Sequence, residues 1–217
     1  MDEKQYIIDS MSINESWRVF RIMAEIVDGI ETLSDVHNAV TFFGSARVKP
    51  DDLYYQKTEK MAKLLVQNGF SVITGGGGGI MEAANKGASE AGGKSVGLNI
   101  KLPYEQKPNP YSNIHLDYKY FFVRKVMFVK YAVAYVILPG GFGTMDELFE
   151  ALTLIQTRKI KSFPLILMGS EYWGGLIDWL KNTMIKEGKI LSADLDLIQV
   201  VDEPEEVVKL IKRYVIV

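Results

Sequence analysis

PGGFGTMDE, residues Pro139–Glu147, is a glycine-rich segment that follows the apolar run Ala132–Leu138 and leads into a helical pattern beginning at Thr144. Glycine allows a close backbone approach to a ligand, and a helix N-terminus offers unpaired N–H groups and the positive end of the helix dipole. Thr144 can cap this helix or bond a phosphate oxygen. The segment therefore predicts an anion-binding turn between a buried strand and a helix.

The carboxylate of Glu147 is unexpected beside such a turn. The helix dipole favours it, but it would repel a bound phosphate unless the two served different ends of one substrate. Thr144 and Glu147 also fit the T-x-x-E pattern of a capping box. For these two residues taken alone, the capping box is the favoured interpretation, and a substrate site is the alternative.

A second glycine run, Gly75–Gly79, follows the apolar run Ser71–Thr74 and precedes the helical stretch Ile80–Ala91. In an open α/β sheet such turns lie outside the carboxyl ends of neighbouring parallel strands, where ligands bind. Neither run matches G-x-G-x-x-G followed by an acidic residue about 20 positions on, and neither contains the Gly-Lys-Ser/Thr of a P-loop. Ordinary dinucleotide binding and phosphoryl transfer are therefore disfavoured.

From Ala39 onward, strand-like and helical patterns alternate, which predicts an α/β fold: a doubly wound parallel sheet (Rossmann-like) with helices on both faces. The predicted strands are Ala39–Phe43, Ser71–Thr74, Ser95–Leu98, Ala134–Leu138, Phe163–Met168 and Ile198–Val201. The predicted helices are Leu53–Asn68, Ile80–Ala91, Phe122–Tyr131, Thr144–Thr157, Tyr172–Glu187 and Glu205–Tyr214. Residues Lys101–Ser112 are expected to form a loop that lines a pocket with Tyr104, Glu105 and Asn109, or a plain surface connection.

The chain of 217 residues is expected to form one nucleotide-binding domain, 1–217, because domains commonly have about 100 to 200 residues. Residues 1–38 are expected to form an N-terminal helical extension. Ser12 and Glu15 fit a capping box, and an amphipathic helix should run to about Leu33 with Trp17, Phe20, Ala24, Val27 and Ile30 on its apolar face. This helix is expected to pack on the flank of the sheet or on a second subunit.

Composition argues against several classes of function. The formal net charge of −2 supplies no basic footprint for nucleic acid and no polybasic membrane patch. The absence of cysteine excludes thiolate metal sites, and His37 and His115 have no partner at metal-ligand spacing, so no metal is expected. The first 16 residues are too polar for a secretory signal, and no apolar stretch reaches the roughly 18 residues of a membrane span. A cytoplasmic protein is expected.

Four predicted turns meet at one edge of the sheet: Gly44–Arg47, Gly75–Gly79, Pro103–Tyr111 and Pro139–Glu147. Arg124 and Lys125 add cations able to clamp a phosphate or ribose, although an Arg-Lys pair is more usually a solvated helix face. A phosphate-binding edge with one carboxylate and one guanidinium suits cleavage of a glycosidic bond in a nucleotide. The carboxylate stabilises the oxocarbenium character of the sugar and activates water, and no metal is needed.

These residues resemble the Lonely Guy (LOG) family, cytokinin-activating phosphoribohydrolases often mislabelled as lysine decarboxylases. PGGFGTMDE matches the family signature PGGxGTxxE, GGGGGIMEAANKGA (75–88) resembles its GGGxxGxM element, and FFVRKVMF (121–128) resembles its Arg-Lys element. FFGSAR and LPYEQKPNPY are similar to the branch found in bacterial nucleotide nucleosidases. The resemblance covers roughly Val40–Val201.

The resemblance implies hydrolysis of a nucleoside 5′-monophosphate, AMP or a cytokinin riboside monophosphate, to free base and ribose 5-phosphate. It implies catalytic Arg124 and Glu147 and no cofactor. Glu82 stands where plant members have glycine, which favours AMP or a broad purine range. The substrate-binding candidates are Gly44, Ser45, Gly75, Gly76, Gly77, Gly79, Glu105, Lys125, Gly140, Gly141, Gly143, Thr144 and Thr153.

Other interpretations stay open. A nucleotide or molybdenum-cofactor carrier on the same scaffold would bind without turnover, because fold alone does not define function; an intact Arg124 and Glu147 favour the enzyme. A structural protein would require both glycine turns to be incidental. A homodimer is expected because family members are typically dimeric and several large apolar groups exceed what one sheet face covers: Trp17, Phe20, Phe121, Phe122 and Phe128.

Overall fold

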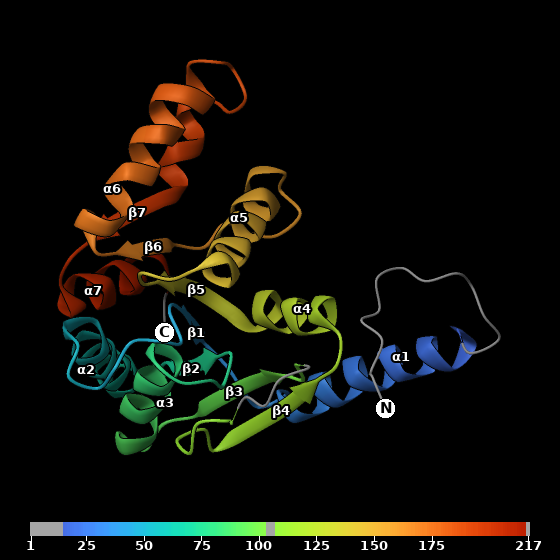
Figure 1. The fold of residues 1–217 in the computed structure, drawn as a ribbon. Coiled ribbons are helices and arrows are strands. Elements are labelled where there is room, and N and C mark those ends of the chain that lie inside the picture. The colour runs from blue at the N-terminus through green and yellow to red at the C-terminus, as the bar shows by residue number, and fades with distance from the viewer. Residues whose placement is uncertain (1–14, 103–106, 216–217) are drawn as a thin grey trace.

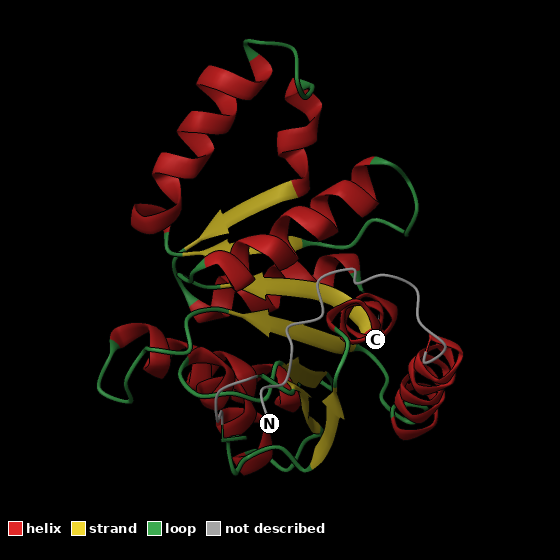
Figure 2. Ribbon diagram, turned by 45° about the vertical axis from the view of Figure 1, so that its right-hand side comes forward, coloured by secondary structure: helices red, strands yellow, loops and turns green. Residues whose placement is uncertain are grey.

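A computed structural model describes residues 15–102 and 107–215 of the chain, with side chains from residue 17 onward. Seven parallel strands form one sheet in the order β4-β3-β2-β1-β5-β6-β7, with helices on both faces (Figures 1 and 2). The predicted doubly wound parallel sheet is therefore confirmed. The strands are β1 (Ala39–Phe43), β2 (Ser71–Thr74), β3 (Ser95–Ile100), β4 (Ile114–Tyr118), β5 (Ala132–Ile137), β6 (Leu165–Met168) and β7 (Ile198–Val201).

The helices form two layers around this sheet. Helices α2, α3 and α7 contribute to the core on one face, and α1, α4, α5 and α6 contribute to the core on the other. They are α1 (Glu15–Thr32), α2 (Leu53–Gln67), α3 (Ile80–Glu90), α4 (Phe121–Tyr131), α5 (Phe142–Gln156), α6 (Ser170–Trp179) and α7 (Pro204–Tyr214), with a π-helical segment at Leu180–Ile185 and a 3₁₀ segment at Ser192–Leu197. Because both faces are covered, all five residues of β1 are buried, and four of them are apolar.

Sequence patterns do not predict β4, the strand at one edge of the sheet. Leu116 and Tyr118 bury their side chains, whereas His115 and Asp117 are exposed. The strand therefore lacks the continuous apolar run that marks an inner parallel strand. With β4 in place, the strand before PGGFGTMDE is the fifth of the chain rather than the fourth.

Helix α1 projects from the end of the sheet beside α4 (Figure 1). The Glu25 carboxylate accepts the N–H groups of Lys119 at 2.9 Å and Tyr120 at 3.3 Å, and Tyr131 donates its hydroxyl to the Ile30 carbonyl at 3.2 Å. These contacts confirm the predicted packing on the flank of the sheet. The predicted capping box cannot be assigned because Ser12 lies outside the described residues.

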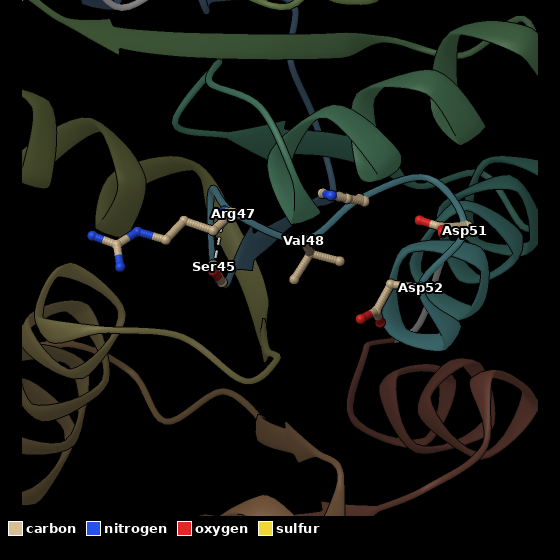
Figure 3. Close-up of a pocket in the computed structure, with 6 residues that line it drawn as sticks. Ser45, Arg47, Val48, Asp51 and Asp52 are labelled. Carbon is tan, nitrogen blue, oxygen red and sulfur yellow. Dashed lines mark hydrogen bonds between the residues drawn. The ribbon is translucent and has the colours of Figure 1, made fainter.

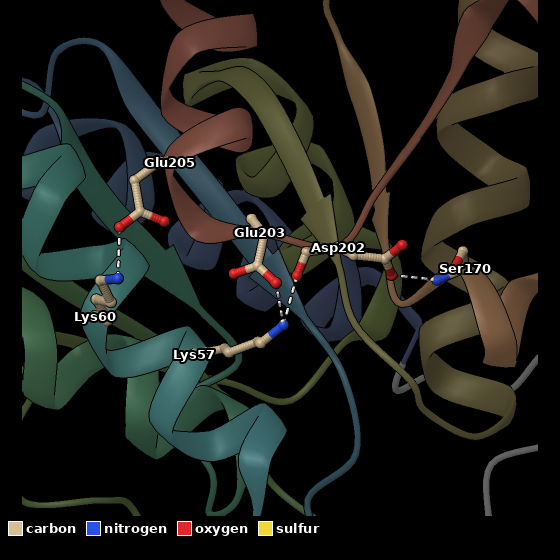
Figure 4. Close-up of polar contacts among 6 residues, drawn as sticks. All are labelled: Lys57, Lys60, Ser170, Asp202, Glu203 and Glu205. Carbon is tan, nitrogen blue, oxygen red and sulfur yellow. Dashed lines mark hydrogen bonds and ion pairs between the residues drawn. The ribbon is translucent and has the colours of Figure 1, made fainter.

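Polar contacts join α2 to the segment that links β7 to α7 (Figure 4). Lys57 contacts the Glu203 carboxylate at 2.9 Å and the Asp202 carbonyl at 2.7 Å, and Lys60 pairs with Glu205. The Asp202 carboxylate accepts the Ser170 N–H at 2.7 Å, which fixes the start of α6. Within the two described ranges, no helix combines the length and apolar character needed to cross a membrane.

Candidate active site

The chain changes direction across the sheet between β1 and β5. Strands β2, β3 and β4 follow on one side of β1, and β5, β6 and β7 lie on the other. In open α/β sheets, ligands bind at the carboxyl ends of the strands at such a switch point. The turns that follow β1, β2 and β5 meet there, because the Ser45 N–H bonds the Pro139 carbonyl at 2.9 Å and the Ile80 N–H bonds the Ser45 carbonyl at 3.0 Å.

Two glycines allow these turns to touch. A Cβ atom at Gly44 would lie 2.7 Å from the Ile80 side chain, and one at Gly79 would lie 2.3 Å from the Ser45 carbonyl oxygen. Gly79 also has a φ of +64°, in the left-handed region that favours glycine. The sequence-predicted residues Gly44, Ser45 and Gly79 therefore form one compact group of turns.

An open hollow of 390 Å³ lies beside this group (Figure 3). Ser45, Arg47, Val48, Lys49, Asp51 and Asp52 line it. The Ser45 hydroxyl accepts the Arg47 N–H at 3.1 Å, and the Arg47 side chain extends away from Asp51 and Asp52. Ser45 thus fixes the turn after β1 through both its backbone and its side chain.

A buried polar network supports the turn at Gly75–Gly79, which is the first glycine turn along the chain. Thr74 donates to the Asn85 amide oxygen at 2.6 Å, and its hydroxyl accepts the Gly76 N–H at 2.9 Å. Asn109 donates to Asn85 and to the Gly77 carbonyl, both at 2.9 Å. The predicted pocket residue Asn109 is therefore a buried support for the turn at Gly75–Gly79. Tyr104 and Glu105 lie outside the described residues.

Helix α5 begins at Phe142, two residues before the predicted start at Thr144. Gly141 is its N-cap residue, and no side chain caps the helix. The capping-box interpretation of Thr144 and Glu147 is therefore wrong, because both residues lie within the helix and are buried. A Cβ atom at Gly140 would lie 2.1 Å from the Thr144 hydroxyl, so Thr144 packs directly on this turn.

Tyr172 supports the second glycine turn along the chain, Gly140–Thr144, and sequence patterns did not reveal this role. Its hydroxyl donates to the Gly140 carbonyl at 2.6 Å. No motif marks this residue, because it reaches the turn from α6, 32 positions further along the chain. The turn at Gly140–Thr144 is thus held by contacts from two helices.

The Glu147 carboxylate lies in a buried, charged environment. The residue is 5% exposed, and its carboxylate lies 3.4 Å from the Lys125 ammonium. Burial raises the pKa of Glu147 to about 7, although Lys125 and Arg124 oppose the rise. Glu147 can therefore exchange a proton near neutral pH, as a general acid or base requires.

Arg124 lies between two aromatic rings and the first glycine turn. Its guanidinium carbon is 5.3 Å from the Phe121 ring centroid and 5.4 Å from that of Phe128, within the range of cation–π attraction. Burial lowers the pKa of Arg124, whereas the charges of Glu147 and Asp146 act to raise it. Its Nε atom is buried and has no hydrogen-bond partner in the described part of the chain.

The Lys125 ammonium forms ion pairs with three carboxylates of α5. Its ammonium lies 2.9 Å from Asp146, 3.4 Å from Glu147 and 2.6 Å from Glu150. Burial acts against its charge, but hydrogen bonds to Glu150 and Asp146 raise the pKa of Lys125 overall. The interpretation of Arg124 and Lys125 as a solvated helix face is therefore wrong. The sequence signal for this cluster is the i, i+1, i+4 spacing of the acids, which places them near one face of α5.

Thr153 lies one turn beyond these carboxylates and is exposed, with its hydroxyl donated to the Phe149 carbonyl at 2.7 Å. It lines an open hollow of 580 Å³ together with Lys125, Phe142, Met145, Asp146, Phe149, Glu150 and Leu154. The structure thus brings Lys125, Thr153 and the start of α5 around one surface hollow. Among the described residues, no group of three or more His, Cys, Asp and Glu side chains is arranged to hold a metal ion.

A Rossmann-like α/β domain, with glycine turns at the carboxyl edge of its parallel sheet, is the class that this fold defines. Within that class, the family model described as "possible lysine decarboxylase" matches residues 81–211. The chain belongs to this family, the LOG family, as the resemblance of its motifs predicted.

Known proteins of two kinds are similar to this chain. The cytokinin riboside 5′-monophosphate phosphoribohydrolase LOG3 of Arabidopsis thaliana is 25% identical over 80% of each chain. The enzyme named LOG from Oryza sativa subsp. japonica is 28% identical over 58% of this chain, and the match spans about half, 52%, of the rice protein. The solved structure of the molybdenum cofactor binding protein from Rippkaea orientalis is 20% identical, with a TM-score of 0.59, and covers 82% of this chain and 96% of its own; it shows the shared fold alone.

Proposed function

We propose that this protein hydrolyses the N-glycosidic bond of a nucleoside 5′-monophosphate and releases the free base and ribose 5-phosphate. The observation that carries the proposal is the buried Glu147 carboxylate, whose pKa is raised to about 7, directly after a glycine turn at a helix N-terminus. The similarity to the two plant phosphoribohydrolases supports the same reaction class. The substrate we favour is AMP, and a cytokinin riboside monophosphate is the second choice.

Phosphate recognition is assigned to the N-terminus of α5. Within the described part of the chain, the N–H groups of Phe142 and Gly143 make no hydrogen bond to a carbonyl outside the helix or to a capping side chain. Such unpaired N–H groups and the helix dipole together favour an anion. Glu147 lies one turn further into the helix, so the phosphate and the carboxylate meet different parts of the substrate.

Glu147 acts on the sugar in this proposal. Its carboxylate accepts a proton from water as the water oxygen bonds to C1′, and the electron pair of the breaking C1′–N bond leaves with the base. The base takes up a proton from solvent, and Glu147 then returns its proton to solvent. The same negative charge stabilises the oxocarbenium character of the sugar. Arg124 binds and positions the substrate, and Lys125 holds the Glu147 carboxylate through the 3.4 Å contact.

Product analysis tests this function. Purified protein is incubated with AMP, isopentenyladenosine 5′-monophosphate, IMP, GMP, CMP and adenosine, and chromatography follows free base and ribose 5-phosphate. We expect release from at least one purine monophosphate and little from adenosine, which lacks the phosphate. Binding of nucleotides without release of base would instead identify a carrier, and hydrolysis of adenosine as efficient as that of AMP would refute the phosphate anchor.

A further inference from the structure

Asn99 carries a buried amide nitrogen without a partner. The residue is the fifth of the six in β3, at the carboxyl end of that strand, and is 8% exposed. Its Nδ2 atom has no hydrogen-bond partner among the residues that the structure describes. Buried side-chain donors are nearly always paired, because an unpaired one loses its bonds to water and gains none. The amide of Asn99 therefore requires an explanation.

The buried polar side chains of Asn85, Thr74 and Ser95, which support the same turn, are satisfied. Asn85 donates to the Ser95 hydroxyl at 2.8 Å and accepts from Thr74 at 2.6 Å and Asn109 at 2.9 Å. Ser95 in turn donates to the Asn85 carbonyl at 3.0 Å. Both asparagines are buried, but only the amide nitrogen of Asn99 lacks a partner within the described residues.

Asn99 and Arg124 lie against consecutive residues of the first glycine turn. A Cβ atom at Gly76 would lie 2.0 Å from the Asn99 Oδ1 atom, and one at Gly75 would lie 3.6 Å from the Arg124 Nη1 atom. Arg124 Nη1 also makes a long contact of 3.5 Å with the carbonyl of Leu98, the residue before Asn99. The buried Arg124 Nε atom is unpaired within the same described residues. Two buried donors without partners therefore flank one turn at the ligand-binding edge.

The place of Asn99 along the sheet points to one part of a nucleotide. The phosphate is assigned to α5, which follows β5, whereas Asn99 lies near the carboxyl end of β3, three strands away in the order β3-β2-β1-β5. Neighbouring strands are about 4.8 Å apart, so the two strand ends are separated by roughly 14 Å. A nucleotide laid along this edge with its phosphate at α5 directs its base, the part farthest from the phosphate, toward β3.

We propose that Asn99 contacts the base of the substrate and selects a 6-aminopurine. The carboxamide presents one donor and one acceptor side by side, and adenine presents an amino donor next to a ring-nitrogen acceptor. Asparagine uses this same bidentate pairing when it reads adenine in nucleic acids. The inference rests on the proposed function, because the direction of the nucleotide follows from the phosphate position assigned there.

Asn99→Ala tests the proposal with three substrates: AMP, purine riboside 5′-monophosphate, which lacks the 6-amino group, and 2′-deoxy-AMP. We expect kcat/KM for AMP to fall roughly 10- to 100-fold, as for loss of a bidentate contact. The fall in kcat/KM should be smaller for purine riboside 5′-monophosphate than for AMP, and as large for 2′-deoxy-AMP as for AMP. An equal fall for AMP and the purine analogue, or no fall for AMP, would overturn the proposal. If Asn99→Ala lowers kcat/KM for AMP but not for 2′-deoxy-AMP, Asn99 contacts the ribose rather than the base, and the proposal is overturned as well.

Thermal stability supplies a second readout that does not depend on turnover. Asn99→Ala removes an unpaired amide, so the melting temperature without ligand stays equal or rises, while the stabilisation by AMP decreases. The matched control Asn85→Ala removes a paired amide, so it lowers the melting temperature and reduces activity on all three substrates alike. Asn99→Leu repeats the test if the alanine variant fails to fold.

The experiment distinguishes failure of the proposed hydrolase function from failure of the proposed base contact. A wild-type protein that hydrolyses none of the three substrates refutes the phosphoribohydrolase assignment. In that case the comparison of AMP with purine riboside 5′-monophosphate as thermal stabilisers, in wild type and Asn99→Ala, still decides the base contact. Stabilisation by AMP that is unchanged in Asn99→Ala would refute it.

Discussion

Glu147 combines a position that favours a negative charge with surroundings that oppose one. The helix dipole and the Lys125 ammonium favour the carboxylate, but the side chain is buried and its pKa is raised to about 7. Lys125 also serves Asp146 and Glu150, so its charge is shared among three carboxylates. The result is a carboxyl group that is only partly ionised at neutral pH, which suits proton transfer.

The raised pKa of Glu147 predicts a pH dependence of stability. Native Glu147 holds its proton more tightly than the unfolded chain does, so its contribution to the free energy of unfolding falls as pH rises from 4.5 to about 7. The difference between these pKa values corresponds to roughly 3 kcal/mol. Glu147→Gln lacks this term, so we expect urea denaturation to show the variant more stable than wild type at pH 8 and similar at pH 4.5. A wild-type advantage at pH 8 would contradict the raised pKa.

Lys125 is expected to position and ionise Glu147. Because its charge opposes the rise of the Glu147 pKa, Lys125→Met should move the rise of kcat/KM with pH to higher pH and lower activity at pH 7. Lys130→Met is the matched control, because Lys130 lies in the last turn of the same helix and contacts the Tyr131 ring instead. Unchanged pH–rate profiles in both variants would exclude this role for Lys125.

The strand-to-helix turns work as one unit because their backbones bond to each other. Ser45 joins the turn after β1 to Pro139 on one side and to Ile80 on the other. The sequence predicted this meeting, since glycine runs after buried apolar strands specify both the turns and their edge of the sheet. The two glycine turns could therefore be selected from the sequence pattern, whereas Arg124 and Glu147 were singled out as catalytic candidates by the resemblance to the LOG family.

Tertiary contacts determine the features that the sequence did not predict. Strand β4 alternates buried and exposed residues, so no apolar run identifies it. Helix α5 starts before Thr144 and includes Gly143, although glycine has a low helix propensity. In the sequence, Asn99 is one polar residue near the end of a mostly apolar strand. Only the three-dimensional structure shows that its amide nitrogen is buried without a hydrogen-bond partner among the described residues.

Gly79 is predicted to be essential for the interlocked turns. In Gly79→Ala the new Cβ atom would lie 2.3 Å from the Ser45 backbone oxygen at a φ of +64°, so both contact and conformation are unfavourable. Gly92→Ala is the matched control, with a φ of +76° and no heavy atom within 4 Å. We expect Gly92→Ala to cost about 1–2 kcal/mol of stability and Gly79→Ala about 1–3 kcal/mol more, with loss of activity. Equal melting temperatures would argue against a tight contact at Gly79.

An apolar surface on α1 and α4 suggests how two copies of the chain associate. Trp17, Phe20, Phe121 and Phe122 are exposed, whereas Phe128 is buried in the core and does not contribute. Helices α1 and α4 lie beside each other and are in contact (Figure 1). Large exposed apolar areas commonly mark interaction sites. We propose that this surface forms a homodimer.

Light scattering at micromolar concentration tests the homodimer. We expect a mass of at least twice the 24.4 kDa of one chain, and a shift toward the monomer in the double variant Trp17→Glu, Phe20→Glu. Leu191→Glu, which changes an equally exposed apolar residue outside α1 and α4, should leave the mass unchanged. A stable wild-type mass near 24.4 kDa would contradict the homodimer.

Turnover of AMP by Glu147→Gln tests the central claim most directly. Glutamine preserves the size of the side chain but neither accepts a proton from water nor offers a full negative charge to the sugar. We predict that the variant folds, still binds AMP and releases adenine and ribose 5-phosphate roughly 100-fold more slowly or worse. Wild-type turnover by a folded Glu147→Gln would contradict the assignment of Glu147 as the catalytic carboxylate.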